Sequence, residues 1–199
     1  NDDLDALVAA VRSSVKYRAV CDEVVRNIGR RELAARRNLK EAIKATKNKL
    51  HQVGAAYLST TMRYAQWTSE LRAASATSDP AAWRAACFRI MGHHASTRER
   101  LPVLDEFYAT ALREIAPVHS VIDVACGLNP LAIPWMPLAH DAIYYAYDMY
   151  DDMMAFIAEF FRMIGQRGQA IACDVLSLPS FPEAELALLL KAIPCLEQM

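Results

Sequence analysis

Glycine, long apolar stretches and paired cysteines are scarce or missing in this 199-residue chain. Only 6 residues are glycine, which excludes a collagen-like repeat and a Gly-rich linker. No run of apolar residues reaches the ~18–20 that a helix needs to cross a bilayer. The opening residues Asn-Asp-Asp-Leu-Asp contain neither the basic nor the apolar segment of a secretory signal. We therefore expect neither a membrane span nor a signal peptide.

The five cysteines do not form pairs along the chain. Their number is odd, their spacing is wide and no C-x-x-C occurs, as their positions show: Cys21, Cys87, Cys126, Cys173 and Cys195. This pattern argues against a disulfide framework and a structural zinc site, and it predicts a cytoplasmic protein in a reducing compartment. His93 and His94 are adjacent, without a Cys or an acidic residue nearby at a ligand spacing. We expect no bound metal.

The charges are divided unequally along the chain. The formal net charge is only −1, yet residues 1–50 carry 12 Lys and Arg against 7 Asp and Glu, and residues 51–199 are net acidic. Nine of these 12 basic residues lie between positions 26 and 49, where several repeat at helical spacing. Such a cluster favours contact with a polyanion. The alternative interpretation is an ordinary solvated helix face.

Periodicity divides the chain into a helical first half and an α/β second half. Helix starts are expected at Asn38, at Asp79 before Pro80, and at Ser96 with Glu99 three residues on. From residue 118 onward, short apolar runs alternate with helix-like stretches, among them 150–164, which predicts an α/β fold with a parallel sheet covered on both faces. The predicted strands are Ser120–Ala125, Ala142–Tyr147, Gln169–Cys173 and Leu186–Leu190. We divide the chain into a helical region, 1–92, and an α/β domain, 93–199.

Three aspartates mark the ends of successive predicted strands. Asp123, Asp148 and Asp174 occupy these places, and Gly127 permits a tight turn after the first strand. Ligands of open parallel sheets bind outside the carboxyl ends of the strands, where a carboxylate can accept from a ribose diol. The aspartates therefore predict an adenosine site. Turn formation and helix capping are the alternative. G-x-G-x-x-G and G-x-x-x-x-G-K-[ST] are absent, which argues against a dinucleotide and a nucleoside triphosphate.

Three stretches resemble the aminoglycoside-resistance 16S rRNA methyltransferases, which methylate N7 of guanine 1405 in the decoding site. The similarity is greatest to the actinomycete producer enzymes of the sisomicin–gentamicin type. The stretches are His94-Ala95-Ser96-Thr97-Arg98-Glu99-Arg100-Leu101, Asp123-Val124-Ala125-Cys126-Gly127-Leu128-Asn129-Pro130-Leu131 and Leu188-Leu189-Leu190-Lys191-Ala192-Ile193-Pro194-Cys195-Leu196-Glu197. The resemblance implies a Rossmann-like class I methyltransferase domain preceded by an all-helical domain.

The resemblance also implies S-adenosyl-L-methionine as cofactor and a set of residues that hold it. Arg100 would pair with its carboxylate, Asp148 would hold the ribose, and Asp174 with Val175 would hold the adenine. Tyr57 would cover the cofactor, and Leu190 would form the floor of the pocket. The whole implied set is Tyr57, His94, Ala95, Ser96, Arg100, Ala125, Gly127, Asp148, Asp174, Val175 and Leu190.

The implied substrate is 16S rRNA in the 30S ribosomal subunit, and the implied outcome is resistance to kanamycin and gentamicin. With this resemblance, the basic cluster becomes the expected RNA surface. Its members are Arg26, Arg30, Arg36, Arg37, Lys40, Lys44 and Lys47. Guanine N7 has a lone pair and no proton, so no general base is expected and catalysis would rest on positioning. The Asn/Asp-Pro-Pro-aromatic motif that binds an exocyclic amine is absent after the fourth strand, where the sequence reads Lys191-Ala192-Ile193-Pro194.

Relatives continue beyond the last residue of this chain, with further strands and a Lys- and Ser-bearing loop. We therefore expect a methyltransferase domain that lacks its last strands. Two other functions stay open on the sequence: a non-catalytic fragment that binds RNA and cofactor, and a methyltransferase with another substrate.

Overall fold

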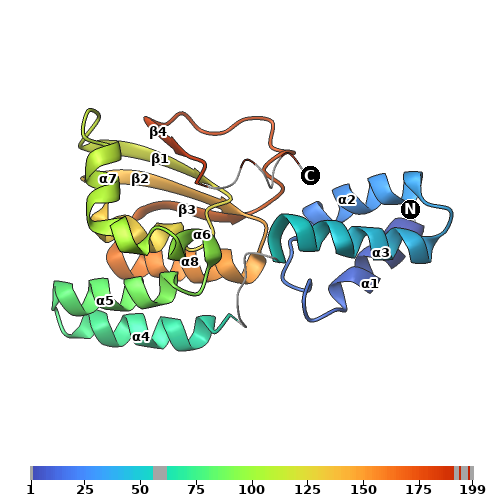
Figure 1. Cartoon of the computed structure of the whole chain (residues 1–199), viewed down its shortest axis with the longest axis horizontal. Coiled ribbons are helices and arrows are strands. Elements are labelled where there is room, and N and C mark those ends of the chain that lie inside the picture. Colours follow the sequence, from blue (N-terminus) through green and yellow to red (C-terminus); the bar gives the residue numbers. More distant parts are fainter. Residues whose placement is uncertain (1, 56–61, 191–192, 194–196, 198–199) are drawn as a thin grey trace.

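The computed structural model describes residues 2–55, 62–190, 193 and 197. Helices fill the first half of the chain and a sheet dominates the second, as Figure 1 shows. The helical elements of the first half are α1 (Asp2–Arg12), α2 (Asp22–Ala35), α3 (Leu39–Leu50), the π-helical turn η1 (His51–Ala55), α4 (Tyr64–Ala76) and α5 (Pro80–Met91). The later elements are α6 (Ala95–Arg98), η2 (Leu101–Val103), α7 (Leu104–Ala111), β1 (Val118–Val124), η3 (Asn129–Trp135), β2 (Leu138–Asp148), α8 (Asp151–Ile164), β3 (Arg167–Ala172) and β4 (Leu186–Leu188).

The first three helices pack on one another through apolar residues at helical spacing. Leu7, Val11, Val25 and Ile28 are buried among them. Asn38 begins α3 as predicted, because its side chain accepts the backbone N–H of Glu41 at 3.0 Å. We call α1, α2 and α3 the helical unit.

Helices α4 and α5 lie with the sheet and not with the helical unit. They pair with each other, α4 contacts α8, and α5 contacts η3. The start at Asp79 is confirmed, because its carboxylate accepts the N–H of Ala81 at 2.9 Å. The expected cap at Ser96 is wrong: α6 begins at Ala95 after His94, and Ser96 is buried inside it. The domain boundary after residue 92 stays a prediction. The helices before this residue lie in two places: α1, α2 and α3 form the helical unit, and α4 and α5 lie beside the sheet.

The sheet has four parallel strands in the order β3-β2-β1-β4. All four predicted strands exist, with different ends. β2 starts at Leu138, four residues before the predicted start, because Leu138 pairs with Val118 of β1. β4 ends at Leu188. Neighbouring strands share a carboxyl edge, because every pair is parallel.

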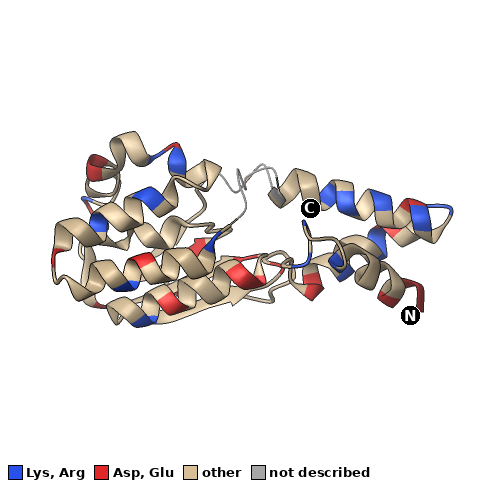
Figure 2. Cartoon of the chain, turned by 90° about the horizontal axis from the view of Figure 1, so that it is seen from below, with Lys and Arg blue, Asp and Glu red and all other residues tan. Residues whose placement is uncertain are grey.

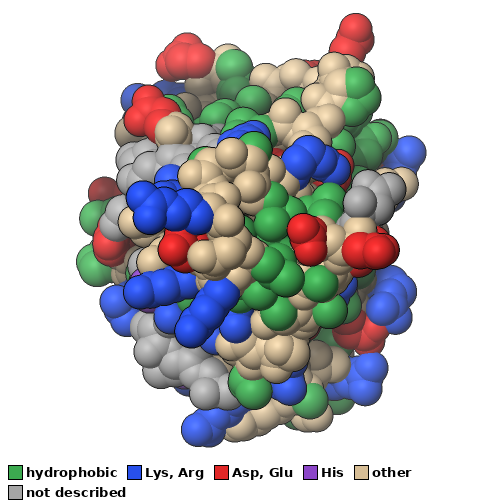
Figure 3. All heavy atoms as spheres, turned by 90° about the vertical axis from the view of Figure 1, so that its right-hand side faces the viewer, with side chains coloured by type: hydrophobic (Ala, Val, Ile, Leu, Met, Phe, Trp, Pro, Cys, Tyr) green, Lys and Arg blue, Asp and Glu red, His purple; other side chains and the backbone are tan. Residues whose placement is uncertain are grey.

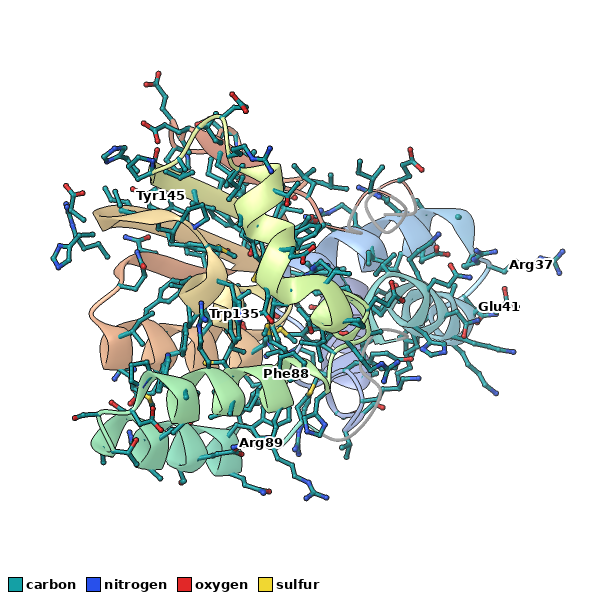
Figure 4. All side chains as sticks on the ribbon, turned by 60° about the vertical axis from the view of Figure 1, so that its left-hand side comes forward. Arg37, Glu41, Phe88, Arg89, Trp135 and Tyr145 are labelled. Carbon is teal, nitrogen blue, oxygen red and sulfur yellow. The ribbon has the colours of Figure 1, made fainter. Side chains whose placement is uncertain are left out.

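The two faces of the sheet are covered differently. Helix α8 packs on β2 and β3 over one face, where Tyr144 and Met153 are fully buried. The other face has a smaller cluster around Ile122 and Tyr147, covered by the turn-rich connection between β3 and β4; Tyr145, labelled in Figure 4, lies with this cluster. The sheet was predicted to be covered on both faces. On this face the covering connection is not helical, and it contains Pro179 and Pro182, which interrupt helical hydrogen bonding.

The helical unit lies at the carboxyl edge of the sheet, where the right-hand part of Figure 1 shows it. Two backbone hydrogen bonds join them: Cys21 N–H donates to Met149 O at 2.8 Å, and Asp151 N–H donates to Ala19 O at 2.7 Å. Arg12 adds an ion pair to Asp151 at 3.3 Å. The carboxyl edge of the sheet is therefore bordered by the helical unit. None of the helices that the structure describes is long and apolar enough to cross a membrane.

Candidate active site

The three predicted aspartates meet at the carboxyl edge of the sheet. Asp123 and Asp148 lie in the last two positions of β1 and β2, and Asp174 follows β3 by two residues. All three are buried, with exposed fractions of 1%, 7% and 2%. Buried carboxylates are uncommon without partners, so this arrangement is typical of a ligand site or a hydrogen-bonded network.

The loop after β1 brings its backbone against Asp148. The N–H of Gly127 donates to Oδ2 of Asp148 at 2.9 Å, and Met149 N–H donates to Oδ1 at 2.7 Å. Gly127 has a φ of +54°, and a Cβ there would lie 2.7 Å from the ring of His94. Ala125 also has a positive φ of 51°. The loop thus needs glycine at position 127, both for its backbone conformation and for the approach of the imidazole.

His94 and Ser96 stand beside this loop. His94 Nδ1 lies 3.1 Å from Ser96 Oγ, and the imidazole is buried. Burial and, to a smaller extent, the nearby Arg100 guanidinium together lower the pKa of His94 to about 4. The imidazole is therefore neutral at pH 7.

Arg100 is held by two acceptors. Its Nη1 donates to the carbonyl of Ser96 at 2.8 Å, and its Nη2 donates to Oδ1 of Asn129 at 2.8 Å. The hydroxyl of Tyr108 donates to the same oxygen at 2.6 Å. Asn129 in turn donates from Nδ2 to Oδ2 of Asp123 at 2.9 Å. A continuous network therefore joins the predicted Arg100 to the end of β1.

Asp123 has one oxygen in that network and one outside it. Its Oδ2 also accepts the hydroxyl of Tyr144 at 2.6 Å. Among the residues the structure describes, no donor reaches Oδ1, which is buried. Burial raises the pKa of Asp123 to about 6, against the lowering effect of its hydrogen bonds. This buried oxygen, which has no hydrogen-bond donor within the described residues, is available to accept from an ammonium or other N–H group of a ligand.

Asp174 is bound to the helical unit. Its Oδ2 accepts from Asn27 Nδ2 at 2.9 Å, and its backbone N–H donates to Glu23 Oε2 at 3.2 Å. Val175 is half-buried against the cluster on the second face of the sheet, and Leu190 packs against the main core.

The structure brings most of the predicted cofactor residues to one region. His94, Ser96, Arg100, Gly127 and Asp148 are linked through direct contacts, Ala95 begins α6 beside them, and Tyr57 falls outside the described residues.

Sequence patterns missed the residues that connect these groups. They are Asn129, Tyr108, Tyr144, Asn27 and Glu23. The one available signal was Asn129, an amide inside the loop that follows the first strand. The others come from distant elements.

The basic residues lie along α2 and α3. Figure 2 shows the basic residues recurring along α3, and Figure 3 shows several Lys and Arg side chains on the face at this end of the molecule. Arg26 is paired with Asp5 at 2.7 Å and with Asp22, and Arg36 is paired with Glu32 at 2.8 Å. Arg37 extends from the tip of the α2–α3 turn (Figure 4). Arg30, Lys40 and Lys44 are exposed, and Lys47 is half-buried.

No cluster of three or more His, Cys, Asp or Glu that could hold a metal occurs within the described part of the chain. His93 stacks on Trp67, with ring centroids 5.0 Å apart. Cys21, Cys87, Cys126 and Cys173 are buried thiols. Burial raises the pKa of Cys126 well above its ordinary value, which makes this thiol a packing group and not a nucleophile.

Known proteins share both this sequence and this arrangement. The family model described as "Ribosomal RNA methyltransferase (FmrO)" matches residues 12–199. The chain belongs to the FmrO family. The 16S rRNA (guanine(1405)-N(7))-methyltransferase of Micromonospora echinospora is 37% identical over 198 residues, 98% of this chain and 72% of that protein. The protein of the same name from Serratia marcescens is 31% identical, over all of this chain and 71% of its own length.

Solved structures of 16S rRNA methyltransferases have the fold of this FmrO-family chain. RmtF, in complex with S-adenosyl-L-homocysteine, is 32% identical with a TM-score of 0.77, over 99% of this chain and 72% of that one. RmtB is 29% identical with a TM-score of 0.78, over 98% and 74%. The family and the class I methyltransferase fold predicted from the sequence are confirmed.

Proposed function

We propose that this chain binds S-adenosylmethionine at the carboxyl ends of β1, β2 and β3 and methylates N7 of guanine 1405 in 16S rRNA. The observation that carries the proposal is the meeting of three buried aspartates with the Gly127 loop and Arg100 at one sheet edge. FmrO-family membership and the similarity to RmtF, which was solved with S-adenosylhomocysteine, support it.

The residues present fit the cofactor from end to end. Arg100 offers a guanidinium for a carboxylate, and the free Oδ1 of Asp123 offers a buried acceptor for an ammonium group. Asp148 accepts the backbone N–H groups of Gly127, Met149 and Tyr150, and its two oxygens together have four lone pairs, so acceptor capacity remains for the ribose. Asp174 is the corresponding acceptor for the adenine amine. Tyr57, Ala95, Ala125, Val175 and Leu190 would complete the pocket.

The reaction requires little acid–base catalysis by the protein. Bound S-adenosylmethionine supplies a methyl group whose carbon–sulfur bond breaks as the carbon–N7 bond forms, leaving a thioether. N7 carries a lone pair and no proton, so no side chain has to remove one. The residues of this chain therefore act by holding cofactor and base in line, which can supply ~7–11 kcal/mol of the barrier. Extruding the stacked guanine costs a few kcal/mol.

The helical unit would supply the RNA surface. A-form RNA is recognised mainly through shape and backbone, for which a rigid cationic surface is sufficient. Arg30, Arg37, Lys40, Lys44 and Lys47 present their charges from α2 and α3. Arg26 and Arg36 share theirs with carboxylates and would contribute less.

We further propose that the substrate is the assembled 30S subunit in the cytoplasm, and that the modification protects it from kanamycin and gentamicin. The names of the relatives support the rRNA target and the modified base.

The cofactor site is tested by calorimetric titration with S-adenosylhomocysteine. Asp148→Ala removes the proposed ribose acceptor, so we expect affinity to fall about 10- to 100-fold, as for hydrogen bonds to a charged group. Asp141→Ala is the matched control, an exposed aspartate of the same strand, and should leave affinity within about twofold of wild type. Equal affinity in Asp148→Ala and wild type would refute the ribose assignment, and no binding by wild type would refute the site.

A further inference from the structure

A side chain of the helical unit contacts the carboxylate assigned to adenine. Asn27, in α2, donates from Nδ2 to Oδ2 of Asp174 at 2.9 Å and to Oγ of Ser177 at 2.6 Å. Asp174 is 2% exposed, so this hydrogen bond lies in a protected environment. Glu23, one turn earlier on α2, accepts the backbone N–H of Asp174. One helix of the helical unit thus holds both the side chain and the backbone of Asp174.

The orientation of the Asn27 amide is set by Arg30. The guanidinium Nη1 of Arg30 donates to Oδ1 of Asn27 at 3.0 Å. An arginine has no acceptor, so the amide oxygen must face Arg30 and the amide nitrogen must face Asp174. In the hydrogen bond between them, Asn27 is therefore the donor and the Asp174 carboxylate is the acceptor.

Asp174 is held on both oxygens and keeps acceptor capacity on each. Oδ1 accepts the N–H of Leu176 at 3.1 Å, and Oδ2 accepts from Asn27. Each carboxylate oxygen has two lone pairs, so one remains on each for a ligand. The rotation of the carboxylate is fixed by these two donors before any ligand arrives.

We propose that Asn27 is a positioning residue for adenine recognition, which rests on the function proposed above. It fixes Asp174 so that a free lone pair of the carboxylate meets the 6-amino group of adenine. An ionised carboxylate accepts and never donates, so a fixed Asp174 favours an amine at this place and rejects a carbonyl. The base specificity of the cofactor site then depends on a helix of the RNA-binding unit.

The proposal predicts a change in specificity and not merely in affinity. S-inosylhomocysteine carries a carbonyl oxygen where S-adenosylhomocysteine carries the 6-amino group. Wild type should prefer the adenosyl compound by about 10- to 100-fold, the range for a hydrogen bond to a charged acceptor. In Asn27→Ala the carboxylate of Asp174 keeps only the N–H of Leu176, so Oδ2 can move and take water, and this preference should fall to about threefold. A general loss of structure would weaken both ligands alike and leave their ratio unchanged.

Two further variants separate the contacts of Asn27. Ser177→Ala removes the second acceptor of the amide and leaves the bond to Asp174, so it should keep the wild-type preference. Arg30→Ala frees the amide to turn, and we expect a preference between those of wild type and Asn27→Ala. Arg30 is exposed, so this variant also provides a test if Asn27→Ala fails to fold.

The measurement is calorimetric titration of the full chain with each compound, with folding checked by circular dichroism. A reduced ratio in Asn27→Ala with an unchanged ratio in Ser177→Ala supports the proposal. The same ratio in wild type, Arg30→Ala and Asn27→Ala overturns it while leaving the cofactor site in place. Failure of wild type to bind S-adenosylhomocysteine refutes the proposed function instead.

Discussion

At the scale of single residues, burial shifts the pKa values of two ionisable groups of the site in opposite directions. Asp123 holds its proton more tightly in the folded chain, because burial raises its pKa from 3.8 to about 6. His94 holds its proton less tightly, because burial lowers its pKa from 6.5 to about 4. The network that joins Arg100, Asn129 and Asp123 thus ends in a weakly acidic carboxyl, and Ser96 joins its Arg100 end to a neutral imidazole.

These shifts act on stability with opposite signs between about pH 4 and pH 6. There the folded state binds more protons than the unfolded state at Asp123, so that residue makes stability fall as pH rises. It binds fewer at His94, so that residue makes stability rise with pH. The two contributions nearly cancel in wild type.

Replacing either residue should reveal how the other makes the free energy of unfolding depend on pH. Relative to wild type, His94→Asn should lose stability as pH rises from 4 to 6, by about 1.4 kcal/mol per unit at most. Asp123→Asn should gain stability over the same range. Urea unfolding at pH 4.5, 5.0, 5.5 and 6.0 measures both differences, and parallel profiles for the two variants would contradict these pKa shifts.

At the scale of elements, the two basic helices differ: lysines of α3 are exposed to solvent, whereas Arg26 of α2 and Arg36 at its end are paired with carboxylates of the protein. Arg26 joins α2 to α1 through Asp5, and Arg36 is paired with Glu32 of its own helix. Lys40 and Lys44, one turn apart, are exposed on α3, and no hydrogen bond or ion pair is found for them within the described ranges 2–55 and 62–190. Free cations contribute more to RNA binding, because a paired arginine must first give up its carboxylate.

Reversing one charge on α3 should therefore weaken subunit binding. We expect Lys44→Glu to lower the affinity for purified 30S subunits and to reduce the slope of log K against log salt by about 1, since one phosphate contact is lost. Arg113→Glu is the control, an exposed arginine just beyond α7 at the opposite end of the molecule from α3. S-adenosylhomocysteine binding should be unchanged in both. Filter binding between 50 and 300 mM salt measures the slopes, and equal slopes for the two variants would exclude α3 as an RNA surface.

At the scale of the whole molecule, the helical unit and the sheet form one assembly around the strand ends. Backbone hydrogen bonds from Cys21 to Met149 and from Asp151 to Ala19 join them, and Asn27 reaches Asp174. The proposed RNA surface and cofactor site are therefore connected through α2 and not through a free linker.

Local patterns predicted the elements of this assembly well. The apolar runs of β1 and β2, the start of α3 at Asn38 and the turn at Gly127 depend on residues close in sequence. The aspartates followed from the rule that parallel strands share a carboxyl edge.

The contacts that hold those aspartates could not be read from the sequence. Asn27 and Asp174 are 147 positions apart, and Asp123 and Tyr144 are 21 apart. No periodicity or spacing relates such pairs, since only the folded backbone brings them together. The cap expected at Ser96 failed for a different reason: α6 begins one residue earlier, after His94, so Ser96 lies inside the helix with its hydroxyl 3.1 Å from Nδ1 of His94.

Mapping of N7-methylguanine in 16S rRNA tests the central claim most directly. Purified 30S subunits are incubated with the chain and S-adenosylmethionine, and N7-methylated guanines are located by borohydride reduction and aniline cleavage. We predict a single new cleavage at guanine 1405 with wild type and Asp141→Ala, and a strongly reduced one with Asp148→Ala. No cleavage at guanine 1405 with wild type that binds both subunit and cofactor, or cleavage at another base, would contradict the account.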